Sequence, residues 1–261
     1  MRAALVLALV LGVALSACRP PVDAPEELAE LCAFIFSHQA DEDQAELIAG
    51  VEQLGAWLDG HPEEALEGYR AVDAPSEATM DSLDDVDRTN AAMVGLAVGR
   101  QSRHPIDETA WALIGVDQDV IYPDDYDAYA REYLSGPDCF LDHECGFMEA
   151  IEETINSFPM ELTSENIVHN QYVWLETARG TSMVHRNWLK EPPIVSNSIL
   201  EVDEQAYVDV LVPGDDGVWR LQSQFTIYSV QDEGIAISAA INYLIGLHDE
   251  LEIWLDDNQA P

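Results

Sequence analysis

The sequence predicts an α+β fold with a helical N-terminal half, an antiparallel sheet of about four or five strands and a long C-terminal helix. Apolar residues recur at helical spacing as far as residue 158, and the pattern then changes to segments rich in Val, Ile, Tyr, Trp and Thr. A last helical pattern begins at about residue 233. Helices that precede and follow a block of strands are expected to cover one face of the sheet.

The helical region is expected to span residues 26–158. Asp41 is placed to cap its second helix, and Pro62 is placed in the first turn of its third. The first two helices have apolar stripes at positions typical of a buried face, consisting of Leu28, Leu31, Cys32, Ile35 and Phe36, and of Leu47, Ile48, Val51, Leu54 and Leu58. Further helices are predicted over 62–70, from 76 to the apolar segment 93–98, and over 106–116, 123–135 and 145–158.

The sheet and the C-terminal helix are expected to span residues 159–261. Strands are predicted over 167–176, 182–190, 198–212 and 218–230. The turn PGDDG, 213–217, is expected to join the last two strands as a hairpin. Asp232 is placed to cap the final helix, over 233–254, whose core face is expected to hold Ala240, Ile241, Leu244, Ile245, His248 and Leu251. By element order, residues 140–256 are similar to the helix-grip lipid-transfer fold, and both halves are expected to form one domain.

Residues 1–17 are predicted to be a signal peptide. Arg2 precedes an apolar run of about fifteen residues, shorter than the roughly twenty needed to span a bilayer. The run ends in Leu-Ser-Ala-Cys, which resembles the lipobox of bacterial lipoproteins, so the resemblance implies cleavage before Cys18 and acylation of its thiol. Plain secretion and a retained anchor are the alternatives. In the sorting rule of such lipoproteins, an Asp directly after the Cys favours retention in the inner membrane. Arg19 occupies that position here, so the resemblance implies the outer membrane. Residues 18–25 are expected to form a Pro-rich tether.

The chain is strongly acidic, with a formal net charge of −39. This charge argues against nucleic acid as a partner, because phosphates would be repelled. Three explanations stay open: a solvated acidic surface suited to high salt, binding of divalent cations, or attraction of a basic partner. Acidic clusters occur at 41–43, at Asp84, Asp85 and Asp87, and at Asp124, Asp125 and Asp127, and none matches a calcium-loop motif.

Three cysteines remain if Cys18 is acylated. Cys139 and Cys145 enclose a short loop and are the expected disulfide in an oxidising compartment, while Cys32 is expected to be a buried thiol, with a Cys32 pairing as the alternative. The loop also holds Asp142, His143 and Glu144, which are weak candidates for a metal site, although their spacing matches no standard zinc motif. No cofactor is expected.

The sequence lacks the common nucleophile, zinc-protease and nucleotide-binding motifs. A hydrolase would have to use His143, His169 or His185 as a base with Glu144 or Glu176, and His169 and His185 are expected on neighbouring strands that let them face one another. Six aromatic residues of the strand region are expected either to line a ligand groove or to pack in the core: Tyr172, Trp174, Trp188, Tyr207, Trp219 and Tyr228.

These observations predict a lipid-anchored envelope protein with a non-catalytic binding or structural role. Its expected partners are the membrane, through the anchor on Cys18, and an envelope protein. The alternative is a carrier of an apolar small ligand, which predicts a cavity between the sheet and the C-terminal helix. The third hypothesis is an envelope hydrolase, which predicts a histidine and a carboxylate about 3 Å apart in a cleft.

Overall fold

The computed structural model describes residues 22–84, 93–158, 162–196, 201–215, 217–229 and 233–258. The signal segment with Cys18, the acidic residues Asp85 and Asp87, and the expected cap Asp232 lie outside these residues. Within them, no helix combines the length and the apolar character that crossing a bilayer requires.

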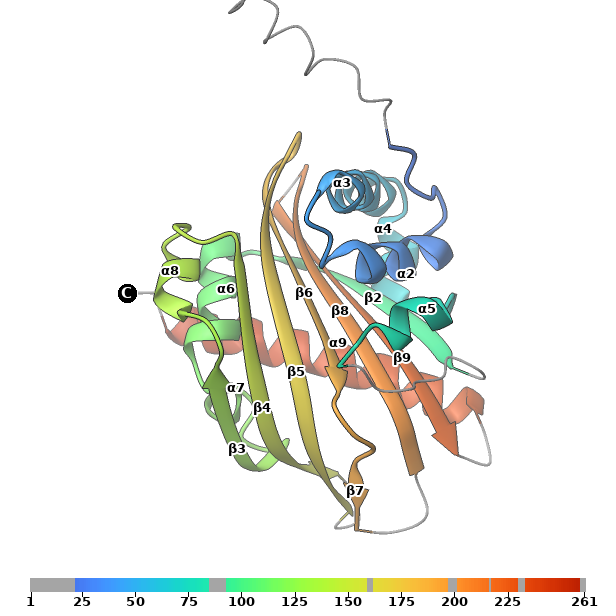
Figure 1. Ribbon diagram of the computed structural model, residues 1–261, viewed down its shortest axis with the longest axis vertical. Helices are drawn as coiled ribbons and strands as arrows, with labels where there is room; N and C mark the ends of the chain where they lie inside the picture. Colours follow the sequence, from blue (N-terminus) through green and yellow to red (C-terminus); the bar gives the residue numbers. More distant parts are fainter. Residues whose placement is uncertain are drawn as a thin grey trace, which may run out of the picture.

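Among the described residues, the central feature is one antiparallel sheet of nine strands in the order β1-β2-β9-β8-β6-β5-β4-β3, with β7 paired to β5 (Figure 1). The strands are β1 Tyr69–Val72, β2 Val94–Ser102, β3 Tyr126–Tyr133, β4 Phe147–Phe158, β5 Leu162–Thr177, β6 Gly180–Leu189, β7 Ile194–Val195, β8 Glu201–Gly214 and β9 Gly217–Ser229. The helices are α2 Leu28–His38, α3 Ala45–Gly60, α4 Pro62–Glu67, α5 Glu77–Asp81, α6 Ile106–Gly115, α7 Gln118–Ile121, α8 Pro137–Leu141 and α9 Glu233–Asp257.

The prediction of a sheet with four or five strands after a purely helical half is therefore wrong. Strands β1 to β4 all lie in the region 26–158 that was expected to be helical. In β4 the apolar residues Phe147, Ile151 and Ile155 are spaced by four, and this spacing fits one face of a strand as well as one face of a helix. The apolar spacing alone therefore could not distinguish the two structures.

Strand β3 was also predicted to be helical, and a buried charge explains why its alternation is hidden. Arg131 lies on the same face as Tyr129 and Tyr133, where an apolar residue would be expected. Its guanidinium donates to Glu152 on β4 (2.8 Å) and to the carbonyl of Leu113 at the end of α6 (3.1 Å). A cation at a helix C-terminus is favourable, so the arginine joins the strand to α6.

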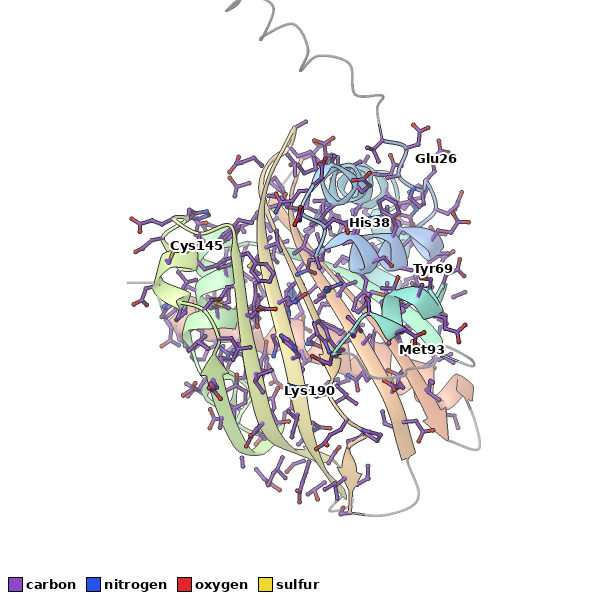
Figure 2. All side chains as sticks on the ribbon, viewed as in Figure 1. Glu26, His38, Tyr69, Met93, Cys145 and Lys190 are labelled. Atoms are coloured by element: carbon purple, nitrogen blue, oxygen red, sulfur yellow. A yellow bond between two sulfur atoms is a disulfide. The ribbon has the colours of Figure 1, made fainter. Side chains whose placement is uncertain are left out.

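Helices α2 to α5 cover one face of the sheet, over β6, β8 and β2 (Figure 1). The predicted stripe of α2 is confirmed, because all five of its residues are buried. The stripe packs with α3 against Val184, Val208 and Phe225 of the sheet. Cys32 is a buried free thiol, and burial raises its pKa to about 12. Figure 2 shows side chains filling the space between these helices and the strands.

The long C-terminal helix α9 was expected from the sequence, but it crosses the face opposite to α2–α5 (Figure 1), so the expectation that the helices cover only one face of the sheet is wrong. Of its six predicted core residues, Ile241, Leu244, His248 and Leu251 are buried, whereas Ala240 and Ile245 are only half-buried. Two separate apolar clusters attach it to the sheet. One joins Ile237, Ile241 and Leu244 to Leu96 and Val98 of β2, and the other joins Leu251 and Leu255 to Tyr172, Trp174, Met183 and Leu211, together with α6 and α8.

Candidate functional site

A group of polar side chains lies on the α9 face of the sheet, between the two apolar clusters. Strand register places Tyr172 opposite His185, His185 opposite Asp209, and Asp209 opposite Gln222. Side chains directly opposite one another in adjacent strands lie on the same face. We call this group the polar belt; it consists of Asn170, His185, Tyr207, Asp209, Arg220 and Gln222.

The centre of the polar belt is an ion pair between Asp209 and Arg220. The guanidinium donates to Oδ2 of Asp209 from Nε (2.9 Å) and from Nη2 (2.6 Å). Only 1% of Asp209 and 3% of Arg220 is exposed, so water screens this pair very little. The carboxylate raises the pKa of Arg220 above its usual value despite the burial of the guanidinium, so the arginine stays charged.

His185 is held as a neutral ring beside this pair. Its Nε2 lies 2.9 Å from Oδ1 of Asn170, and its ring stacks on Tyr172 with centroids 4.2 Å apart. Burial, and then the nearby charges of Arg220 and Arg131, lower the pKa of His185 to about 3. An imidazole with this pKa is a weak base at neutral pH, so the ring is suited to hydrogen bonding and packing rather than to proton transfer.

Four buried polar atoms of the belt have no hydrogen-bond partner among the described residues: Asn170 Nδ2, Asp209 Oδ1, Arg220 Nη1 and Gln222 Oε1. The amide nitrogen of the same Gln222 side chain, Nε2, donates to the hydroxyl of Tyr207 (2.7 Å). A buried polar atom without a partner destabilises a fold by about 1–3 kcal/mol. Because four such atoms occur in one patch, the patch is a candidate site for a molecule that supplies the missing partners.

The polar belt is covered by Tyr122 at the end of α7 and by His248 of α9. The hydroxyl of Tyr122 lies near the guanidinium of Arg220, and burial raises its pKa to about 12. Burial, followed by the charges of Arg220 and Arg100, lowers the pKa of His248 to about 4. His248 also lines an open cleft of about 590 Å³ between β2 and α9, so one residue borders both the cleft and the belt.

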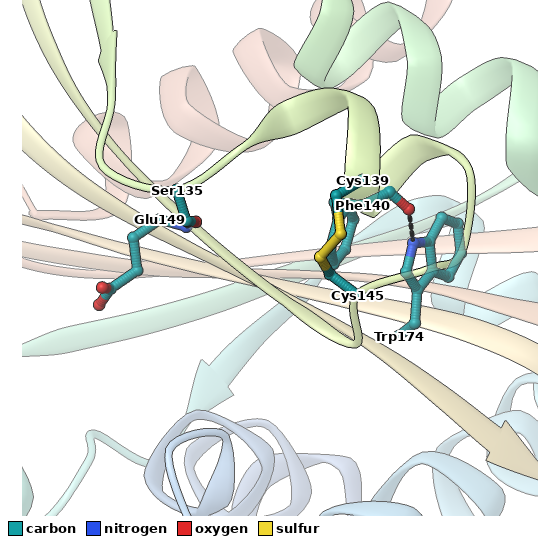
Figure 3. Close-up of a disulfide and its surroundings, with 6 residues drawn as sticks. All are labelled: Ser135, Cys139, Phe140, Cys145, Glu149 and Trp174. Carbon is teal, nitrogen blue, oxygen red and sulfur yellow. Dashed lines mark hydrogen bonds between the residues drawn. A yellow bond between two sulfur atoms is a disulfide. The ribbon is translucent and has the colours of Figure 1, made fainter.

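The structure joins Cys139 and Cys145 by the expected disulfide, with Cα atoms 5.4 Å apart (Figure 3). The bond closes the loop that follows α8. Between the two cysteines, the carbonyl of Phe140 accepts a hydrogen bond from the indole of Trp174 (2.8 Å). The disulfide therefore fixes a loop that packs on the edge of the second apolar cluster.

The weak metal candidates Asp142, His143 and Glu144 are not brought together as ligands. Nε2 of His143 lies 3.0 Å from Asp107, and its ring stacks on Trp174. In the described part of the chain, no group of three or more His, Cys, Asp or Glu residues has an arrangement that could hold a metal ion.

The expectation that His169 and His185 face one another is wrong. His169 lies opposite Trp188 and His185 lies opposite Tyr172, so the two histidines are three positions apart in register and lie on opposite faces of the sheet. On the far face from α9, Nδ1 of His169 is 3.1 Å from Asp84, which also accepts a hydrogen bond from the indole of Trp188. His169 therefore links the segment after α5 to the sheet.

One histidine that the sequence did not indicate lies in a cleft with a carboxylate. Nδ1 of His38 is 2.7 Å from Oδ2 of Asp41, in a cleft of about 450 Å³ between α2 and α5. The nearby hydroxyl of Ser37 donates to the carbonyl of Ala33 (2.8 Å) and accepts from Thr79 (3.0 Å). This serine is engaged with other groups and makes no bond to His38 that would activate it as a nucleophile.

The six aromatic residues of the strand region divide between the two faces. Tyr172, Trp174 and Tyr207 lie on the α9 face, whereas Trp188 and Trp219 pack against the N-terminal helices. The side chain of Tyr228 lies outside the described residues. Packing in the core is thus confirmed for Tyr172, Trp174, Trp188 and Trp219, which belong to buried clusters, whereas the lining of a ligand groove stays a prediction.

Sequence reasoning missed Asn170, Asp209, Arg220 and Gln222. A signal was present in the segment AYVDVLV, where Asp209 has the same alternation as Tyr207 and Leu211. A charged residue at an inward position of a strand is unusual and often marks a functional site. The register that assembles the four residues could not be read from any single segment.

Comparison with protein-family models gives no match, and comparison with curated proteins gives none either. Solved structures give matches at low sequence identity. A STAR-related lipid transfer protein from Xanthomonas axonopodis is 15% identical over 66% of this chain and 89% of its own, with a TM-score of 0.45. Ara h 8.0201 is 13% identical over 64% of this chain and 99% of its own, with a TM-score of 0.38.

The lipid transfer and protein localization domain of human StarD13 is also similar, at 9% identity over 61% of this chain and 74% of its own, with a TM-score of 0.35. At these scores the similarity does not assign a function to this chain, so the functional conclusion has to come from its own side chains.

Proposed function

We propose that this protein binds a small ligand, without transforming it, between the sheet and α9. The observation that carries the proposal is the convergence of four unpartnered buried polar atoms on one patch of the polar belt. A small-molecule site typically combines an apolar lining with a few polar groups that fix orientation. Here the two apolar clusters under α9 supply the lining, and the belt between them supplies the polar groups.

The chemistry of the belt favours binding over hydrolysis. Its histidine has a pKa lowered to about 3 and is bonded to a neutral amide, so the usual pair of a base and an orienting carboxylate is not formed there. The arginine and the aspartate are bonded to each other, and this arrangement provides fixed hydrogen-bonding groups.

Native mass spectrometry tests this proposal. The chain from Pro20 onward, exported behind a secretory signal, keeps every described residue and lacks the expected anchor. We expect excess mass that is lost in organic solvent but not on chelation. A clean ligand-free mass, together with no change in thermal stability on adding an extract of the native envelope, contradicts the proposal.

We further propose that the domain is held on the outer membrane by acyl chains on Cys18. The lipobox-like segment before Cys18 supports this proposal, and residues 18–25 leave only a short tether before α2. Two or more acyl chains anchor a protein stably. Cys18→Ala is expected to move the protein out of the membrane fraction, and a variant that remains there contradicts the proposal.

A further inference from the structure

We infer that the ligand of the polar belt has a neutral head group that both donates and accepts hydrogen bonds, such as a hydroxyl or a primary amide, on an apolar body. This inference rests on the proposed function and adds the chemical class of the ligand. It follows from three features of the site: the kinds of atoms that lack partners, the charge around them, and the apolar surfaces on either side.

The unpartnered atoms are of both kinds. Arg220 Nη1 and Asn170 Nδ2 are donors, whereas Asp209 Oδ1 and Gln222 Oε1 are acceptors. Nδ1 of His248, which covers the belt, is also buried and unpartnered within the described chain. A carboxylate head accepts only, so it would leave the Asp209 and Gln222 oxygens unpartnered. An ammonium head donates only, so it would leave the Arg220 and Asn170 nitrogens unpartnered.

The charge of the site disfavours an anionic head. Arg220 is already neutralised by Asp209, with two hydrogen bonds to one carboxylate oxygen. Its cross-strand neighbour Arg100 is paired with Asp249 of α9 at 3.0 Å. With both guanidinium groups paired, a second carboxylate would meet Asp209 Oδ1 in a poorly screened interior and the field of a chain with net charge −39.

The surroundings of the belt favour an apolar body behind the head group. On one side lie Leu96, Val98 and Ile241, and on the other lie Trp174, Leu211 and Leu251. The head group would thus meet the belt while the rest of the molecule extends along one of the two apolar clusters. Burial of that body supplies affinity, and the head group supplies the selectivity.

A series of ligands with one chain and different heads tests this inference. Decanol, decanamide, decanoate and decylamine are titrated into the chain from Pro20 onward by isothermal calorimetry, below their critical micelle concentrations. We expect decanol and decanamide to bind at least about tenfold more tightly than decanoate and decylamine, because each charged head leaves two or more site atoms unpartnered.

Decanoate or decylamine binding as tightly as decanol overturns the inference but leaves the proposed function standing. No binding by any of the four, with no ligand in the native mass spectrum, contradicts the proposed function itself.

Two variants locate the selectivity. Gln222→Leu removes one of the two unpartnered acceptors that a carboxylate head cannot satisfy, so we expect it to reduce the preference for decanol over decanoate by about fivefold or more. Ser182→Ala is the matched control, because Ser182 Oγ is also buried and unpartnered among the described residues. Ser182 precedes Met183 in β6, so its side chain lies on the opposite face of the sheet, away from the polar belt. The control should leave the preference unchanged. An equal change in both variants contradicts the assignment, and if Gln222→Leu does not fold, the ranking of the four ligands on the unmodified chain decides.

Discussion

The buried ion pair of the polar belt gives the sharpest prediction about stability. Asp209→Leu removes the carboxylate that accepts two hydrogen bonds from Arg220, at 2.9 and 2.6 Å, and leaves an unpaired charge on an arginine of which only 3% is exposed. Removing one partner of such a pair typically destabilises a protein by about 3–5 kcal/mol. A domain has a total stability of about 5–15 kcal/mol, so the variant should unfold at a much lower urea concentration.

The companion double variant separates the unpaired charge from other losses. Replacing both partners, as Asp209→Leu with Arg220→Met, leaves no buried charge, and such replacements are often neutral or stabilising. We therefore expect the double variant to recover most of the loss. The matched control is Asp249→Leu, which breaks the Arg100–Asp249 pair, where 55% of the aspartate side chain is exposed. Loss of an exposed pair should change stability by at most about 1 kcal/mol.

The assay is urea unfolding followed by circular dichroism, with each variant compared at the same pH and salt concentration. Two results would refute the reasoning. One is a loss of less than about 1 kcal/mol in Asp209→Leu, which would mean that Arg220 finds another partner or water. The other is a double variant as unstable as the single one, which would mean that the aspartate acts through something other than its charge.

Three further predictions concern the whole chain. Burial lowers the pKa of His185 to about 3 and that of His248 to about 4 in the folded protein, so unfolding takes up protons below pH 6.5. The contribution of these histidines to stability should be full above pH 6.5 and should fall by about 1.4 kcal/mol per pH unit per histidine down to about pH 4. Urea unfolding from pH 7 to pH 4.5 without this slope would show that the rings are solvated. Replacing Cys139 and Cys145 by serine should cost about 2–3 kcal/mol by the same assay, and an unchanged midpoint would show that the loop holds itself closed. If the charge of −39 reflects adaptation to salt, the melting temperature should rise with KCl as well as with CaCl₂, whereas a response to micromolar calcium alone would point to a cation site instead.

The elements that could be predicted are those whose pattern is complete within one segment. The stripe of α2, the hairpin between β8 and β9, and α9 all have unambiguous local signals. Strand β4 does not, because apolar residues spaced by four fit both periodicities, and a buried Arg131 obscures β3. Tertiary contacts, rather than local preference, decide the structure of these segments.

The candidate site could not be predicted because no single segment contains it. Asn170, His185, Asp209 and Arg220 come from four different strands and are assembled by register. A one-residue change of register would move any of these side chains to the other face, as the positions of His169 and His185 illustrate. Alternation indicates which residues of a strand share a face, but only the pairing of the strands indicates which residues meet.

A crystal structure of the protein purified without denaturation or extraction would test the central claim most directly. We predict density for an organic molecule under α9, with a polar group within hydrogen-bonding distance of both Arg220 Nη1 and Asp209 Oδ1 and an apolar body along one of the two clusters. Density explained by separate ordered waters at these atoms, with no molecule between them, would contradict the claim and leave the polar belt as a hydrated structural network.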